Sequence, residues 1–149
     1  MRLWHKSLIP HLPRQQLLGQ HRECCALRGR GWGRKHTTVN YVWENHTPSH
    51  LVAYHYLVMN EMKARGYHIN PIWYNVNWRG NTLGEVDGWA AQKLVDVLVN
   101  KKEILYKEHD DKYLQECLEN LKSKGVFDGL LLDEEIRLQR LALVSRLQT

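Results

Sequence analysis

The sequence predicts an all-α protein: a compact single-domain helical bundle with an extra C-terminal helical hairpin. Apolar residues recur at helical spacing in four stretches and in a fifth, weaker one. The two-residue alternation of a β-strand is confined to a short, weak instance at 39–43. A chain of 149 residues is long enough to bury a core without disulfides or metal, so we expect one domain over residues 1–149.

The first helix is expected to begin at Pro13, because a proline in the first turn loses no intrahelical hydrogen bond. It carries Leu17, His21, Cys24 and Arg28 along one stripe. Three glycines, at 29, 31 and 33, follow the helix, and we expect residues 29–46 to form an irregular loop.

The second helix is expected after Thr47 and Pro48, a good cap followed by a first-turn proline. Gly66 suits its end, and residues 67–86 are typical of a loop. The apolar stripe of this helix consists of Leu51, Tyr54, His55, Val58 and Met62.

Three aspartate-capped segments are expected to form the remaining helices. Asp87 precedes the first, which carries Ala91, Leu94, Val95 and Leu98. Asp110 or Asp111 precedes the second, with Leu114, Cys117, Leu118 and Leu121 inside. Asp133 precedes the last, with Ile136, Arg140 or Leu141, Val144 and Leu147. We expect 103–149 to form a helical extension, packed as a hairpin on a basic body of residues 1–100.

The composition is that of an ordinary globular protein, with 43% hydrophobic and 25% charged residues. No apolar run approaches the ~18 residues of a membrane span, and the first residues lack the apolar core of a signal peptide. We therefore expect a cytoplasmic protein with no membrane partner and with its three cysteines reduced. The oligomeric state is left open.

Positive charge is concentrated in the first third of the chain. Residues 1–50 hold eight Lys/Arg and two Asp/Glu, whereas 51–100 are balanced and 101–149 carry a net charge of −1. Such a basic segment indicates a phosphate-bearing partner, although a solvated basic surface without a partner explains the charge equally well.

The segment 28–36 favours the nucleic-acid interpretation, because cations neutralise phosphates and tryptophan stacks on bases or wedges between them. Trp32 is our candidate wedge, with Trp43 and Trp78 as alternatives. The predicted DNA contacts in this segment are Arg28, Arg30, Trp32, Arg34, Lys35 and His36.

We predict no metal site and no cofactor. His21 with Cys24 or Cys25 has the i,i+3 and i,i+4 spacing of two zinc ligands, but the sequence offers no second pair at ligand spacing. His50 and His55 are merely near one another. The glycine-rich stretch 29–33 follows a helix rather than a strand, unlike a dinucleotide-binding loop.

Three blocks of sequence resemble the pyrimidine-dimer DNA glycosylases, the endonuclease V-like family of phages and bacteria. They are LLGQHRE at 17–23, GRKH at 33–36 and LVMNEMKARGYHI at 57–69. The resemblance covers roughly residues 1–75, and its most specific part is the pair Arg22 and Glu23. It implies a compact helical domain whose N-terminal segment passes between helices to reach the active site.

The resemblance also implies a mechanism. In the family, the α-amino group of the mature chain attacks C1′ of the damaged nucleotide and releases the base through an imine. An essential glutamate, Glu23 here, stabilises the cationic sugar and assists strand cleavage by β-elimination. The corresponding amine is that of Met1, since aminopeptidases generally spare a methionine before a large residue such as Arg2. Arg2 and Arg22 complete the predicted DNA contacts.

This chain departs from the family pattern at several positions. Gln16 stands where the family has a histidine, and Ala26 where it has an arginine, with Arg28 as a substitute. The aromatic, basic tail that helps the phage enzyme hold its lesion is missing, because the chain ends SRLQT. The resemblance therefore supports the chemistry more strongly than the specificity for dimers.

The expected function is a DNA glycosylase with AP-lyase activity on UV-damaged pyrimidines in double-stranded DNA. Two alternatives remain open. One keeps the chemistry but changes the lesion to an oxidised or ring-opened base or an abasic site. The other is a non-catalytic nucleic-acid-binding module.

Overall fold

The computed structural model describes residues 2–29, 37–44, 46–80, 83, 88–101 and 104–123. The described residues confirm the all-α fold, and an isolated antiparallel bridge joins Trp78 and Leu83. The elements in chain order are η1 (Lys6–His11), α1 (Arg14–Arg28), α2 (Thr37–Glu44), α3 (Pro48–Ala64), η3 (Pro71–Tyr74), α4 (Gly88–Val99) and α5 (Asp111–Ser123), where η denotes a 3-10 helix.

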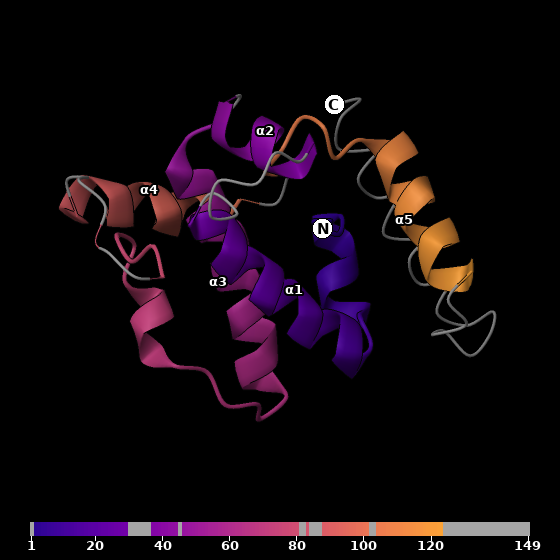
Figure 1. Ribbon diagram of the computed structural model, residues 1–149, viewed down its shortest axis with the longest axis horizontal. Coiled ribbons are helices and arrows are strands. Elements are labelled where there is room, and N and C mark those ends of the chain that lie inside the picture. The colour runs from indigo at the N-terminus through magenta and orange to yellow at the C-terminus, as the bar shows by residue number, and fades with distance from the viewer. Residues whose placement is uncertain are drawn as a thin grey trace.

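Helix α3 forms the centre of the bundle, with α1 and α4 packed against it (Figure 1). Its buried residues occupy nearly its whole circumference rather than one stripe, as expected of a helix with neighbours on several sides. The N-terminal segment lies between α1 and α5 (Figure 1). The buried residues of α3 are Leu51, Val52, Ala53, Tyr54, His55, Tyr56, Val58, Met59 and Met62.

Two helix ends follow the signals in the sequence. Gly66 adopts a left-handed φ of 82°, its N–H donates to Lys63 O over 3.0 Å, and Tyr67 N–H donates to Met62 O over 2.9 Å. These paired bonds form a Schellman motif, which only a residue tolerant of positive φ can close. At the start of α5, the Asp110 carboxylate accepts the Tyr113 N–H over 2.9 Å, as an N-cap.

Helix α1 confirms the first predicted helix, with Leu17, Cys24 and Arg28 buried and His21 half-buried. Pro13 is its N-cap residue, one position earlier than a first-turn proline, and its carbonyl accepts the Leu17 N–H over 2.9 Å.

Helix α2 corrects the expectation of an irregular loop over 29–46. Its threonines and valines have low intrinsic helix propensity, which hid it in the sequence. Tertiary contacts stabilise it instead: Val42 is fully buried and the Trp43 indole donates to Leu27 O over 2.7 Å. The Tyr41 hydroxyl also lies 2.8 Å from His109 Nε2.

Smaller differences concern the remaining elements. Two 3-10 turns, η1 and η3, were not predicted, and Leu94 on α4 is 40% exposed rather than inside. The Thr47 hydroxyl does not cap α3 but lies 2.7 Å from His50 Nδ1. Helix α5 buries Leu114, Cys117, Leu118 and Leu121 as predicted, whereas the helix expected after Asp133 lies outside the described residues.

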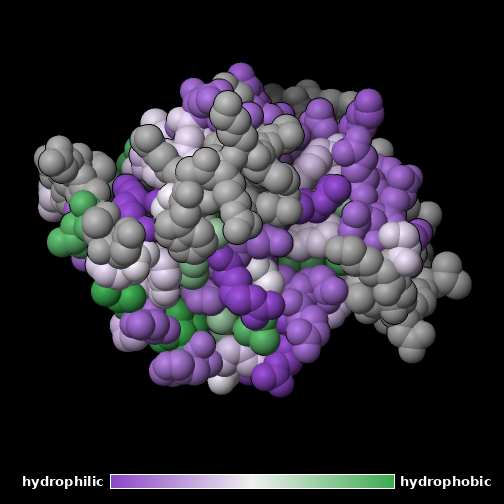
Figure 2. All heavy atoms as spheres, viewed as in Figure 1, coloured by the Kyte–Doolittle hydropathy of each residue, from purple (hydrophilic) through white to green (hydrophobic). Residues whose placement is uncertain are grey.

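The surface of the bundle is mixed in character. Hydrophilic side chains dominate the described part of the face in Figure 2, with apolar side chains in smaller patches. Among the described residues, no helix is both long and apolar enough to cross a membrane.

Candidate active site at the N-terminal segment

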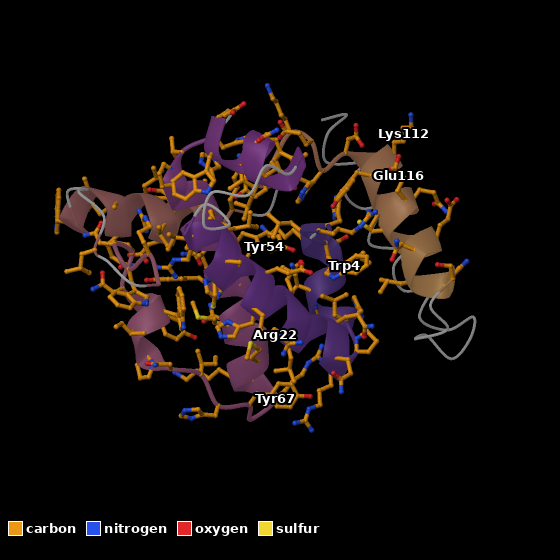
Figure 3. All side chains as sticks on the ribbon, in the orientation of Figure 1. Trp4, Arg22, Tyr54, Tyr67, Lys112 and Glu116 are labelled. Carbon is orange, nitrogen blue, oxygen red and sulfur yellow. The ribbon has the colours of Figure 1, made fainter. Side chains whose placement is uncertain are left out.

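The residues preceding η1 are extended and pass through the interior. Leu3, Trp4 and His5 are at most 5% exposed. Figure 3 shows Trp4 beside α1, on the side that faces α5. An extended segment inside a protein has no helix or sheet to satisfy its backbone, so its N–H and C=O groups need side-chain partners.

Gln20 on α1 supplies two of these partners from one buried amide. Its Nε2 donates to Arg2 O over 2.8 Å, and its Oε1 accepts the Trp4 N–H over 2.7 Å. The side chain therefore pairs with the backbone on both sides of Leu3, much as a neighbouring strand would. With an exposed fraction of 1%, this amide fixes the register of the segment along α1.

The same amide also holds Glu23. Gln20 Nε2 donates to Glu23 Oε2 over 3.0 Å, and the Arg2 backbone N–H approaches that oxygen at 3.3 Å. Gln20 and Glu23 lie three residues apart, on one face of α1. The half-buried carboxylate is therefore placed at the peptide nitrogen that links Arg2 to residue 1.

Three consecutive carbonyls of the segment receive side-chain donors from three helices. Arg2 O accepts from Gln20 on α1, Leu3 O from the Tyr113 hydroxyl on α5, and Trp4 O from the Tyr54 hydroxyl on α3. The Tyr54 hydroxyl also lies 2.8 Å from Gln20 Oε1. The segment thus runs through a cradle built by α1, α3 and α5.

The Arg2 side chain turns towards α5 rather than along α1. Its guanidinium lies 5.7 Å from the centre of the Trp4 ring and 5.8 Å from that of Tyr113. Cation–π attraction to these two rings orients the guanidinium. Burial raises the pKa of the Cys117 thiol on α5, and the nearby Arg2 guanidinium offsets part of that rise.

The family model described as pyrimidine dimer DNA glycosylase matches residues 1–75. The chain belongs to this family. Searches of curated proteins and of solved structures find no match. The match includes the N-terminal segment, α1, α2, α3 and η3 and stops before α4, so Gln20, Glu23 and Tyr54 lie within the family region and Tyr113 lies outside it.

Among the predicted DNA contacts of this family member, Arg22 is exposed on α1, next to Glu23. Met1, Arg30, Trp32, Arg34, Lys35 and His36 lie outside the described residues. Trp43, an alternative wedge, is held in place by its bond to Leu27 O, and Trp78 is half-buried.

Arg28 occupies a different place from the one predicted. It is 1% exposed, and its guanidinium donates to Trp73 O and Asn75 O, each over 2.5 Å, and to Trp78 O over 3.2 Å. Burial, with Arg79 nearby, lowers the pKa of Arg28 to about 10, so the group stays charged at neutral pH. Because its donors serve backbone carbonyls, Arg28 organises segment 73–78.

His21, Cys25 and His55 place potential metal-binding atoms within 4.8 Å of one another. Arg28 Nη1 lies 3.2 Å from His55 Nδ1 and can only donate, so the His55 proton sits on Nε2, 2.8 Å from His21 Nδ1. A metal would need that Nε2 lone pair and would add charge beside a buried arginine. The geometry is that of a hydrogen-bond relay from Arg28 through His55 to His21.

The sequence singled out Glu23 as a candidate site residue but not Gln20, Tyr54 or Tyr113, which contact the N-terminal segment in the structure. The Gln20 signal was present, because a glutamine three residues before the glutamate shares its helix face. Tyr54 was assigned to the core stripe of its helix. Nothing local distinguishes Tyr113, whose partner Leu3 lies 110 residues away.

Proposed function

We propose that this family member removes damaged pyrimidines from duplex DNA and cleaves the strand by imine chemistry, with the Met1 amine as nucleophile and Glu23 as the catalytic carboxylate. The observation that carries the proposal is the position of Glu23 Oε2, 3.3 Å from the Arg2 backbone nitrogen. The amine of the preceding residue is one residue from that nitrogen, within reach of the carboxylate.

The chemistry requires an uncharged amine and a nearby anion. The amine nitrogen bonds to C1′ while the glycosidic bond breaks. The electron pair of the glycosidic bond leaves with the base, which takes up a proton. The amine loses its protons as the sugar ring opens to the imine. Removal of a C2′ proton then expels the 3′ oxygen. An α-amine has a pKa near ~7.7–8.0, so a useful fraction is uncharged at neutral pH.

Glu23 is suited to two parts of this sequence. Its negative charge stabilises the cationic sugar as the base leaves. Its carboxylate is also a base that can accept the C2′ proton. The bond from Gln20 holds one carboxylate oxygen in place, so the group is oriented before DNA arrives.

A borohydride trap tests the proposal. An abasic-site duplex offers an aldehyde to which any imine-forming amine adds with loss of water, and borohydride reduces the C=N bond to a stable link. We expect a trapped adduct that maps to Met1 and disappears when the N-terminus is acetylated. An adduct that persists after acetylation would assign the nucleophile to a lysine, with Lys6 and Lys35 the first to test. Lys6 already donates its amine to Lys101 O.

The lesion is a separate part of the proposal. A panel of duplexes carrying a thymine dimer, an oxidised pyrimidine, a ring-opened purine or an abasic site decides specificity. We expect the dimer duplex to be cleaved. Cleavage of another lesion in its place would support the same chemistry with a different substrate.

A further inference from the structure

Helix α5 lies outside the family region yet contacts the N-terminal segment directly. Tyr113 donates its hydroxyl to Leu3 O, two residues from the proposed nucleophile. This hydroxyl is the middle one of the three side-chain donors to the segment, between those of Gln20 and Tyr54. Without it, Leu3 O would lose its α5 partner while the bonds on either side remained.

Two neighbours contact the Tyr113 ring. His109 stacks on it with ring centres 4.6 Å apart and an interplanar angle of 14°. The Arg2 guanidinium lies 5.8 Å from its centre. His109 is fixed in turn by the Tyr41 hydroxyl on α2, 2.8 Å from its Nε2. A ring oriented in this way directs its hydroxyl towards Leu3 O.

The contacts of Arg2 connect the same helix to the residue that follows the nucleophile. Its side chain lies against Tyr113 and Cys117, both on α5, while its backbone N–H faces Glu23 on α1. A shift of α5 would therefore move Arg2 relative to Glu23. The position of the Arg2 backbone relative to the Glu23 carboxylate therefore depends on both helices.

We propose that α5 is a positioning element for the nucleophile, with Tyr113 as the positioning residue that sets the distance between the N-terminal amine and Glu23. This inference rests on the proposed function. It gives the first helix of the C-terminal extension a role in the reaction, with no contact to DNA required of it. The family region supplies the carboxylate, and this chain's own extension completes the cradle.

The test is Tyr113→Phe in the full chain, which keeps the ring and removes only the hydroxyl. We expect the rate constant for borohydride trapping at saturating abasic-site duplex to fall roughly two- to tenfold, the range for one lost hydrogen bond. The Kd for the duplex is expected to stay unchanged. The pH midpoint of trapping should fall, because an amine held further from the Glu23 carboxylate loses an opposite charge that favours its protonated form.

Tyr56→Phe is the matched control, because Tyr56 also donates its hydroxyl to a backbone carbonyl, that of Tyr74, away from the N-terminal segment. It is expected to lose comparable thermal stability but to keep the wild-type trapping rate and pH midpoint. Equal effects of the two variants on trapping would overturn the proposal, because Tyr113 would then contribute only to the stability of the fold.

Two further outcomes separate this inference from the proposed function. A Tyr113→Phe variant that traps as fast as the wild type, while N-terminal acetylation abolishes trapping, overturns the role of α5 alone. A wild-type chain that forms no adduct overturns the proposed function and the inference with it.

Discussion

The side-chain amide of Gln20 donates to Glu23 Oε2 over 3.0 Å and, from the same nitrogen, to Arg2 O over 2.8 Å. One buried group therefore fixes both the carboxylate and the backbone of the residue that follows the proposed nucleophile. In the proposed mechanism this arrangement preorganises the reacting groups, which is where much of the catalytic advantage of an enzyme arises.

Glu23→Gln is expected to bind abasic-site and lesion duplexes with wild-type affinity but to lose strand cleavage by roughly 10²-fold or more, the scale for loss of a catalytic acid or base. The amide keeps the shape of the carboxylate and removes its charge. Gel electrophoresis of cleaved duplex, with binding measured by fluorescence anisotropy, separates the two effects. Glu116→Gln on the exposed surface of α5 (Figure 3) is the control and should cleave normally.

Gln20→Glu is expected to reduce both stability and trapping. The new carboxylate can still accept the Trp4 N–H, but it has no donor for Arg2 O and places negative charge beside Glu23. The loss of unfolding free energy should be about 1–3 kcal/mol, measured by urea denaturation. Gln15→Glu adds the same charge at an exposed position of α1, and a similar loss there would refute the argument from Gln20.

The sequence predicted four of the described helices because each carries an apolar stripe and recognisable end signals, as Gly66 and Asp110 illustrate. It missed α2, whose stability comes from contacts with distant residues such as the bond from Trp43 to Leu27 O. Local pattern carries no information on such pairings, so residues of low helix propensity were assigned to a loop.

The candidate site was predictable only in part, for a related reason. Glu23 could be found because it stands in a motif, whereas the roles of Gln20 and Tyr113 depend on where the N-terminal segment passes. Arg28 was expected at the surface because an arginine in a basic segment is normally exposed, whereas the structure buries it. Its burial becomes understandable only with the carbonyls of segment 73–78 in place.

Acid should destabilise the protein before its carboxylates are protonated. Burial lowers the pKa of His5 to about 4, against opposing effects of Asp111 and Asp110, and lowers that of His109 to about 3 with help from His5 and His46. Below pH ~6.5 the unfolded chain binds protons that the folded chain does not, so stability falls as the pH drops towards 4.

Each of these histidines contributes at most about 1.4 kcal/mol per pH unit in that window. Urea denaturation at several pH values between 7 and 4.5 measures the slope. His5→Asn keeps an acceptor for the Ser7 N–H that His5 Nδ1 now accepts, and should flatten the slope. His68→Asn, at an exposed position, is the control. A slope unaffected by His5→Asn would contradict the assignment.

Arg28→Met should unfold the protein more easily without changing how DNA binding responds to salt. Removing the guanidinium leaves the carbonyls of Trp73, Asn75 and Trp78 without their buried donor, at a cost of at least about 2–4 kcal/mol in unfolding free energy. The slope of log Kd for DNA against log salt concentration is expected to stay unchanged, because no phosphate contact is lost. A smaller salt dependence of DNA binding, measured at a temperature where the variant is folded, would show that Arg28 contacts a DNA phosphate.

Arg22→Ala should leave stability nearly unchanged but reduce the salt dependence of DNA binding. Arg22 is exposed one residue before Glu23, where a side chain from α1 can reach a phosphate flanking the lesion. Loss of one phosphate contact lowers the slope of log Kd against log salt by about 1 and weakens binding to all sequences alike. Fluorescence anisotropy titrations at several NaCl concentrations between about 50 and 200 mM measure this slope.

Arg14→Ala is the control. Arg14 lies near the start of the same helix, with its guanidinium 5.2 Å from the Tyr67 ring centre. Equal slopes for the wild type and Arg22→Ala would show that Arg22 contacts no phosphate and would contradict this prediction.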